Sequence, residues 1–202
     1  MHGLNSFSFL RGACMEPVPR HQCLVYHGAP SEHLAGLALM IRKNLDANYR
    51  CLYLNNPAMV AGIRAYLTSS GINVSEAIIQ KRLILSSDQD HLVDNAFDPW
   101  RMMDMLKQTH DAALKDGFDG LWASGDMAWE FGPARDFSTL VAYERALERF
   151  FQTHPTLSGI CQYHADVLPD EVVQHGLQLH PALYINETLS RLNPGYLRSG
   201  AC

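Results

Sequence analysis

The chain has 202 residues, of which 47% are hydrophobic and 18% are charged, and its formal net charge is -5. This composition excludes a disordered chain, and the length suits one α/β domain with a sizeable core. Lys and Arg are scattered without a basic run, which argues against a direct nucleic-acid partner.

Neither a membrane segment nor an export signal is expected. No run of about 18 apolar residues occurs, and the short apolar run near the start is broken by Arg11. The five cysteines, an odd number, form no C-x-x-C pair, which indicates free thiols in the reducing cytoplasm. We expect a flexible leader over residues 1–20, one domain over residues 21–190 and a tail over residues 191–202.

Short apolar runs, typical of buried strands, alternate with segments of helical periodicity. In chain order the pattern predicts a strand at 23–26, a helix capped by Ser31, a strand at 51–54, a helix from Pro57 to Gly71, a strand at 83–85, a helix at 99–115, a strand at 120–123, a helix at 137–153, and strands at 157–163 and 182–185. This alternation implies a three-layer α/β fold, in which helices flank a mostly parallel central sheet. Ligands of such folds bind beyond the carboxyl ends of the strands.

The turn after the first strand occupies the place of a phosphate-binding P-loop, whose pattern is G-x-x-x-x-G-K-[ST]. Gly28 matches the first position, but His33, Leu34 and Ala35 stand where the second Gly, the Lys and the Ser/Thr would be. Leu34 cannot neutralise a phosphate and Ala35 cannot ligate magnesium. The pattern therefore predicts a degenerate P-loop; the alternative is that Gly28 is only a turn glycine.

The positions that would activate water in a RecA-like ATPase are also changed. Enzymes of the circadian-clock type carry two carboxylates after the second strand, where this chain has Asn55 and Asn56, and an amide is not a general base. Asp126 resembles the metal-side Asp of a Walker B strand, but its partners are missing. We therefore expect no enzymatic activity and no cofactor.

Several short segments match a known family in their order and spacing. They are His21–Tyr26, Arg50–Tyr53, Gly125–Trp129, Tyr143-Glu144, Cys161–Tyr163 and His180-Pro181. Through them, residues 21–185 resemble the MEDS domain, the sensory domain of methanogen and methylotroph proteins and of the dichloromethane-responsive repressor DcmR. The resemblance implies a RecA-like fold and a role in sensing simple hydrocarbon derivatives. Relatives often carry a DNA-binding or kinase domain, and neither is expected in this chain. The resemblance therefore implies that this chain acts through a partner kinase or transcription regulator, or as a homo-oligomer.

Five residues at the predicted carboxyl ends of strands are candidate ligand contacts: His27, Asp126, Trp129, Tyr163 and His164. The histidines can donate, accept or take up a proton, and Asp126 near Trp129 would offer a charge beside an aromatic wall. The alternative for each residue is a structural role, as a loop histidine, a helix cap or a core ring.

No metal site is predicted. His21 and Cys23 share a strand face and could form metal ligands with Cys51 and Cys161, but their spacings match no zinc pattern. Cysteines in strands are commonly buried hydrophobes.

Other charged and ring side chains are interpreted as structural. Glu144 could contact a ligand, but an ion pair with Arg145 or Arg149 is the preferred interpretation. We predict a surface position for four further histidines: His91, His110, His154 and His175.

The leading hypothesis is a non-catalytic sensory domain that binds a small organic ligand and relays this binding to a regulator. One alternative is an interaction module of RecA-like descent without a ligand. The other is an atypical nucleotide-binding protein, against which Leu34 and Ala35 argue.

Overall fold

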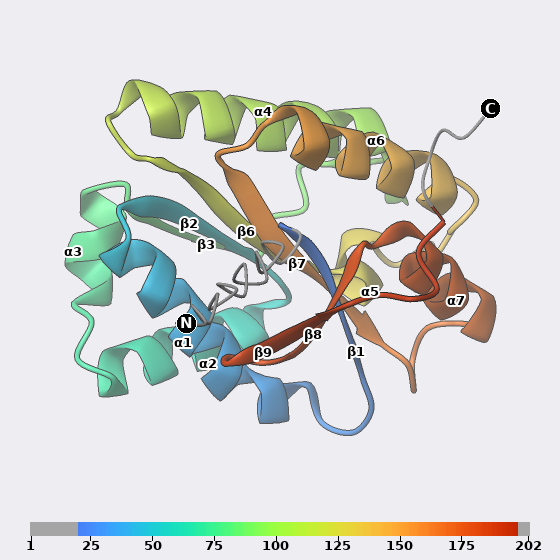
Figure 1. Cartoon of the computed structure of the whole chain (residues 1–202), viewed down its shortest axis with the longest axis horizontal. Helices are drawn as coiled ribbons and strands as arrows, with labels where there is room; N and C mark the ends of the chain where they lie inside the picture. Colours follow the sequence, from blue (N-terminus) through green and yellow to red (C-terminus); the bar gives the residue numbers. More distant parts are fainter. Residues whose placement is uncertain (1–19, 198–202) are drawn as a thin grey trace, which may run out of the picture.

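A seven-stranded sheet lies between two layers of helices in the computed structural model, which describes residues 20–197 (Figure 1). The strands of this sheet are β1 (His21–Tyr26), β2 (Tyr49–Leu54), β3 (Leu83–Ser86), β6 (Gly120–Asp126), β7 (Leu157–His164), β8 (Ala182–Asn186) and β9 (Leu189–Leu192). Their spatial order is β3-β2-β6-β7-β1-β8-β9. Neighbours run parallel except β9, which is antiparallel to β8. The predicted three-layer α/β fold is confirmed.

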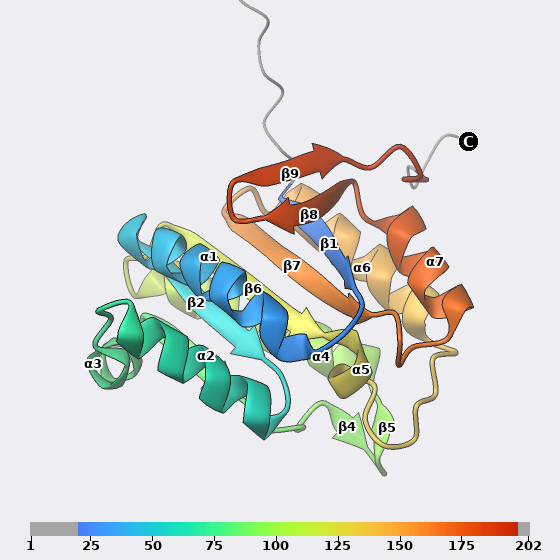
Figure 2. The ribbon, with the colours of Figure 1, turned by 90° about the horizontal axis from the view of Figure 1, so that it is seen from below.

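The helices divide between the two faces of the sheet (Figures 1 and 2). One face carries η1 (Pro30–His33), α1 (Leu34–Asp46), α2 (Pro57–Ser69) and α3 (Val74–Ile79), and the other carries α4 (Pro99–Lys115), α6 (Leu140–Thr153) and α7 (Asp170–Leu179). Each face has its own core, and alternate strand residues enter opposite cores: Leu121 packs on the α4 side and Trp122 on the α1 side.

Most predicted elements are present, and the differences lie at their ends and in short elements. Ser31 does not cap a helix with its side chain; it lies inside η1, whose N-cap is Ala29. The strand predicted at 120–123 continues to Asp126. Not predicted were α3, α7, β9, the short α5 (Met127–Glu130), and the hairpin of β4 (Leu92–Val93) and β5 (Ala96–Phe97). Most of these have too few residues for a periodic pattern to be recognised.

Two histidines predicted at the surface are buried instead. His91 Nε2 lies 2.7 Å from the Glu130 carbonyl oxygen, and His110 Nε2 lies 2.9 Å from Thr156 Oγ1. Both rings are therefore satisfied inside the protein. A hydropathy pattern cannot distinguish such a buried, hydrogen-bonded histidine from an exposed one.

In the turn after β1, the backbone of Gly28 is hydrogen-bonded within the protein. Gly28 has a φ of 78°, in the left-handed region, and its N–H donates to Asp166 Oδ2 at 2.7 Å. A backbone donor that could approach an anion is thus bonded to the protein's own carboxylate. Leu34 is buried in the core, and Ala35 is exposed.

The free-thiol prediction is confirmed for Cys23, Cys51 and Cys161, which are buried. Cys14 and Cys202 lie outside the described residues, as do residues 1–19 of the expected leader and residues 198–202 of the expected tail. The sheet itself extends into the expected tail, because β9 ends at Leu192.

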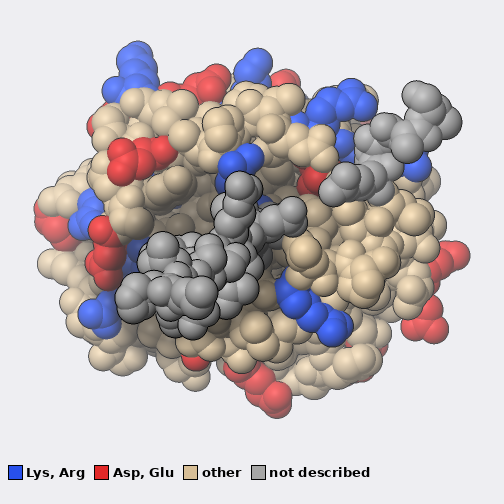
Figure 3. Space-filling view, viewed as in Figure 1, with Lys and Arg blue, Asp and Glu red and all other residues tan. Residues whose placement is uncertain are grey.

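None of the helices within residues 20–197 combines the length and hydropathy that a membrane crossing requires. On the described part of the face in Figure 3, Lys and Arg side chains are dispersed among Asp and Glu. That face therefore offers no continuous cationic surface.

Candidate functional site

Three adjacent strands, β6, β7 and β1, end at one edge of the sheet with Asp126, His164 and Tyr26. These side chains line a hollow of about 380 Å³, which we call the carboxyl-edge pocket. Its walls are Tyr26, Pro30, Asn56, Gln89, Asp126, Ala128, Trp129, Gly132, His164 and Val167. Both the position beyond the strand ends and the volume are typical of small-molecule sites.

Asp126 supplies a carboxylate to this pocket. Its Oδ1 accepts the Trp129 backbone N–H at 3.0 Å, which caps α5, and its Oδ2 accepts the Tyr26 hydroxyl at 3.1 Å. The residue is only 6% exposed, and burial raises its pKa, mainly by removing water from the charged form. The cap and the pocket role are compatible, because the same bonds that cap α5 also fix the carboxylate.

Tyr26 contacts two imidazole rings in the same region. Its ring stacks on His164 at 4.7 Å between centroids, and it meets His33 at 4.6 Å in a tilted arrangement. Nε2 of His164 and Nε2 of His33 are buried without a hydrogen-bond partner among residues 20–197. Asp166 Oδ2 is 3.8 Å from His164 Nε2, too far for a hydrogen bond. Buried polar atoms of this kind are normally satisfied by water or a ligand.

A hydrogen-bonded layer lies under the strand ends on the α1 side. Gln162, the β7 neighbour of Asp126, donates to Ser124 Oγ at 2.9 Å, and Ser124 donates to the Ile160 carbonyl at 2.7 Å. Asn55 donates to the Tyr53 hydroxyl at 3.1 Å. These buried bonds hold the strand ends that carry the pocket.

Of the five predicted ligand contacts, Asp126, Trp129 and His164 line the pocket together. His27 lies outside the set of lining residues. Its imidazole is exposed, and its Nδ1 is 2.6 Å from Asp166 Oδ1. His27 thus contributes to a surface hydrogen bond with Asp166.

Tyr163 is held on the other face of the sheet. It is fully buried, and its hydroxyl donates to Glu144 Oε1. Successive strand residues point to opposite faces, so Tyr163 and His164 do not share one site. This alternation was a sequence signal that could have separated them.

Sequence reasoning missed several residues of the pocket walls, among them Tyr26 and Gln89. Tyr26 could have been found, because it is the last residue of its strand and therefore lies at the carboxyl edge of the sheet, where ligands of α/β folds bind. His33, which contacts the Tyr26 ring but does not line the pocket, was considered only as a lost P-loop glycine. Nothing in the sequence singles out Gln89, which lies in the segment after β3 and donates to the Trp129 carbonyl at 3.0 Å.

A larger hollow, of about 650 Å³, lies between α4 and strands β2 and β3. Arg50, one of its lining residues, is already paired with Asp116 at 2.5 Å. The other charged side chains of its walls (Asp88, Asp90, Arg101, Asp104) are exposed. With no unsatisfied buried group in its walls among the described residues, this groove is the weaker candidate.

A second group of side chains, which we call the buried cluster, consists of His21, Glu144, Cys161 and His180. One potential ligand atom from each lies within 4.8 Å of the others, and all four residues are buried. Sequence analysis considered His21 and Cys161 together as possible metal ligands, but nothing in the sequence pattern joined Glu144 and His180 to them.

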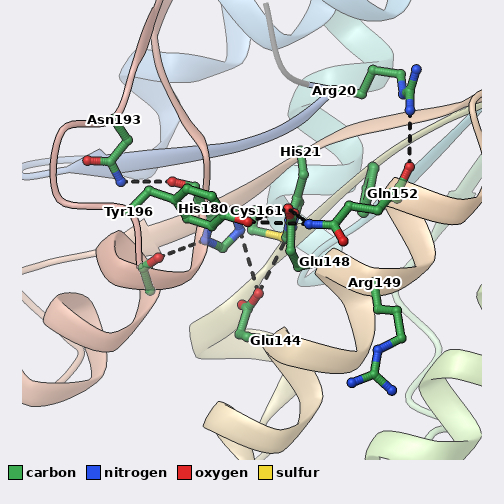
Figure 4. A network of polar contacts seen from close by, with 12 residues as sticks. Arg20, His21, Glu144, Glu148, Arg149, Gln152, Cys161, His180, Asn193 and Tyr196 are labelled. Carbon is green, nitrogen blue, oxygen red and sulfur yellow. Dashed lines mark hydrogen bonds and ion pairs between the residues drawn. The ribbon is translucent and has the colours of Figure 1, made fainter. Parts of the chain in front are cut away.

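The predicted ion pair of Glu144 with a neighbouring arginine is wrong. Glu144 is fully buried, with its carboxylate beside His180. Arg145 is exposed, and Arg149 points away from Glu144 (Figure 4). The cause is helical geometry, since α6 turns Glu144 inward and both arginines outward.

Comparison with known proteins gives one family and no curated relative. A search of curated proteins found no match. The family model described as the methanogen/methylotroph, DcmR sensory domain (MEDS) matches residues 20–181, which covers all of the carboxyl-edge pocket and the buried cluster. The chain therefore belongs to the MEDS family of sensory domains.

Proposed function

We propose that this protein is a non-catalytic sensory domain that binds a small polar organic molecule in the carboxyl-edge pocket and passes this signal to a partner. The observation that carries the proposal is the convergence of a buried Asp126 carboxylate with the unpartnered His164 Nε2. Membership in a sensory family supports the same role.

The pocket walls favour a short ligand with one polar end. Trp129, Ala128 and Val167 offer apolar surface, while Asp126 and His164 offer an acceptor and an imidazole. A small alcohol or amine could donate to Asp126 and contact the apolar wall at the same time. Hydrocarbon derivatives of this size agree with the class of ligand that the family resemblance implies.

Several residues of the chain argue against nucleotide hydrolysis and support a binding role. Leu34 and Ala35 supply neither the cation nor the hydroxyl of a P-loop. The Gly28 N–H is bonded to Asp166, which would repel a phosphate from that turn. Asn55 and Asn56 offer no carboxylate as a general base.

The loops above the pocket provide a route for the signal. The Arg135 guanidinium, in the loop after α5, donates to the carbonyl of Val167, in the loop after β7. Val167 and Trp129 both line the pocket, so a ligand that contacts them would shift these loops together. Val167 is 41% exposed, at a surface that a partner regulator or a second copy could recognise.

The test is a thermal-shift screen of the purified chain against short alcohols, amines, halomethanes and organic acids, with ATP and ADP plus magnesium as a separate arm. A ligand at about 100 times its Kd should stabilise the fold by about 2.7 kcal/mol, or several degrees. The shift should be lost in Asp126→Asn and Trp129→Ala and retained in the matched control Asp104→Asn, on the wall of the α4 groove.

Other results of the thermal-shift screen would favour a different function or a different site. A shift with nucleotide alone would favour the nucleotide-binding alternative. Silence across the panel would favour a ligand-free interaction module. An organic ligand whose effect is lost only in Asp104→Asn would move the site to the α4 groove.

A further inference from the structure

The buried cluster joins four elements of the fold at one point (Figure 4). His21 begins β1, Cys161 lies in β7, Glu144 lies in α6, and His180 directly follows α7. None of the four exposes more than 6% of its surface. His21 and Cys161 are 140 residues apart in the sequence, so only the tertiary fold brings them together.

Both imidazoles are oriented with Nε2 toward the cluster. Nδ1 of His180 lies 2.8 Å from the Gly176 carbonyl oxygen, which can only accept, so this nitrogen carries the proton. Nδ1 of His21 lies 2.8 Å from Glu148 Oε2. A carboxylate oxygen accepts, so Nδ1 of His21 carries a proton, and its other ring nitrogen, Nε2, faces Cys161 Sγ at 3.5 Å. Metal-bound histidines typically donate their other N–H to a carboxylate or a carbonyl in this way.

Two electron-pair donors face each other inside the cluster. Glu144 Oε2 and His180 Nε2 are 3.6 Å apart, and neither has a hydrogen-bond partner among residues 20–197. The other carboxylate oxygen of Glu144 accepts the Tyr163 hydroxyl, which fixes the group in place. This arrangement is unfavourable unless a cation or a proton compensates both atoms.

We propose that the buried cluster binds one Zn²⁺ through His21 Nε2, His180 Nε2, Cys161 Sγ and the Glu144 carboxylate. Tetrahedral zinc, at roughly 2.0–2.3 Å from its ligands, requires neighbouring ligand atoms roughly 3.3–3.8 Å apart. His21 Nε2 lies 3.5 Å from Cys161 Sγ and 4.0 Å from Glu144 Oε2, and the latter lies 3.6 Å from His180 Nε2. Small side-chain shifts would complete the geometry.

The donor set selects zinc rather than a harder cation. Thiolate and imidazole suit Zn²⁺, whereas Mg²⁺ and Ca²⁺ prefer sites made of oxygen. Cys161 would bind as a thiolate, and its proton would pass to solvent. Four protein ligands leave no open position, which is typical of a structural site.

Such a zinc ion would fasten α6 and the end of α7 to the two central strands β1 and β7. The cluster lies on the opposite face of the sheet from the carboxyl-edge pocket, because Cys161 and Gln162 point to opposite sides of β7. The zinc proposal is therefore independent of the ligand proposed for that pocket.

The first experiment uses the full chain, kept reduced and stripped of metal with a chelator. One equivalent of Co²⁺ should give a thiolate-to-cobalt absorption band in the near ultraviolet, and Zn²⁺ should displace it. Zn²⁺ in excess of its Kd should also raise the melting temperature by several degrees. Absence of both the band and the shift in the wild-type chain would overturn the proposal, with no variant needed.

The second experiment assigns the ligands. Cys161→Ser should abolish the cobalt band, and His180→Gln should weaken metal binding at least tenfold. The matched control is Cys51→Ser, a buried cysteine on the other face of the sheet, which should retain the wild-type band and affinity. A band that persists in Cys161→Ser, or one lost in Cys51→Ser, would overturn the assignment. Equal metal binding by the wild type and all three variants would indicate binding at the surface only, and it would also overturn the assignment.

Discussion

Two substitutions of Asp126 separate its structural role from its role in the pocket. Asp126→Ala removes the acceptor of the Trp129 N–H and the partner of the Tyr26 hydroxyl. Loss of a helix cap costs about 1 kcal/mol, and a buried hydroxyl left unpaired costs about 1–3 kcal/mol. Removing a buried carboxylate offsets part of this loss. We therefore expect the free energy of unfolding to fall by about 1–3 kcal/mol.

Asp126→Asn should behave differently, because asparagine caps helices as well as aspartate does. Its amide oxygen can still accept the Trp129 N–H, and its amide N–H can donate to the Tyr26 oxygen. We expect a stability within about 1 kcal/mol of the wild type. A ligand that donates to the carboxylate should nevertheless lose at least tenfold in affinity, since hydrogen bonds to charged groups contribute about 1.5–3 kcal/mol.

Urea unfolding followed by circular dichroism measures the two stabilities, and thermal shift measures the ligand response. For a chain of this size, 1 kcal/mol corresponds to about 2–4 °C in melting temperature. An Ala variant as stable as the wild type would refute the hydrogen-bond argument. An Asn variant with the full ligand response would refute the role of Asp126 in the pocket.

Burial, and to a lesser degree the nearby carboxylates, raise the pKa of Glu130 well above its usual range. The contribution of Glu130 to stability is therefore fully present below its pKa in the unfolded chain, and it is lost as pH rises through its pKa in the folded chain. Glu130→Gln should flatten this decline in urea unfolding as the pH is raised from about 4, and equal declines in both chains would contradict it. Gly176→Ala would place a Cβ 2.5 Å from the Tyr163 ring, so we expect a loss of about 1–3 kcal/mol by the same assay, and an unchanged midpoint would show that the ring can move. Combining Leu34→Lys with Ala35→Thr should not create ATP binding, and it should destabilise the chain because the lysine charge would be buried; ATP binding by calorimetry would contradict this.

The layered fold could be predicted because its signals are local. Each strand and helix must bury its own apolar face, so the spacing of apolar residues along the sequence indicates directly whether a segment is a strand or a helix. The same reasoning led to Asp126 and His164, which end their strands, and to Trp129, which lies in α5 directly after β6, because ligands of α/β folds bind beyond the carboxyl ends of the strands. It failed for Tyr163, where strand alternation turns the ring to the other face.

The sequence by itself therefore determined the alternation of strands and helices and part of the pocket at their carboxyl ends. Only the tertiary structure decided that β6, β7 and β1 lie side by side, and that His21, Glu144, Cys161 and His180 meet inside the protein. A polar residue in a strand or helix looks the same in sequence whether it is solvated or satisfied by a distant partner. Its environment depends on which elements pack together, and that choice is made by the whole chain rather than by any local pattern.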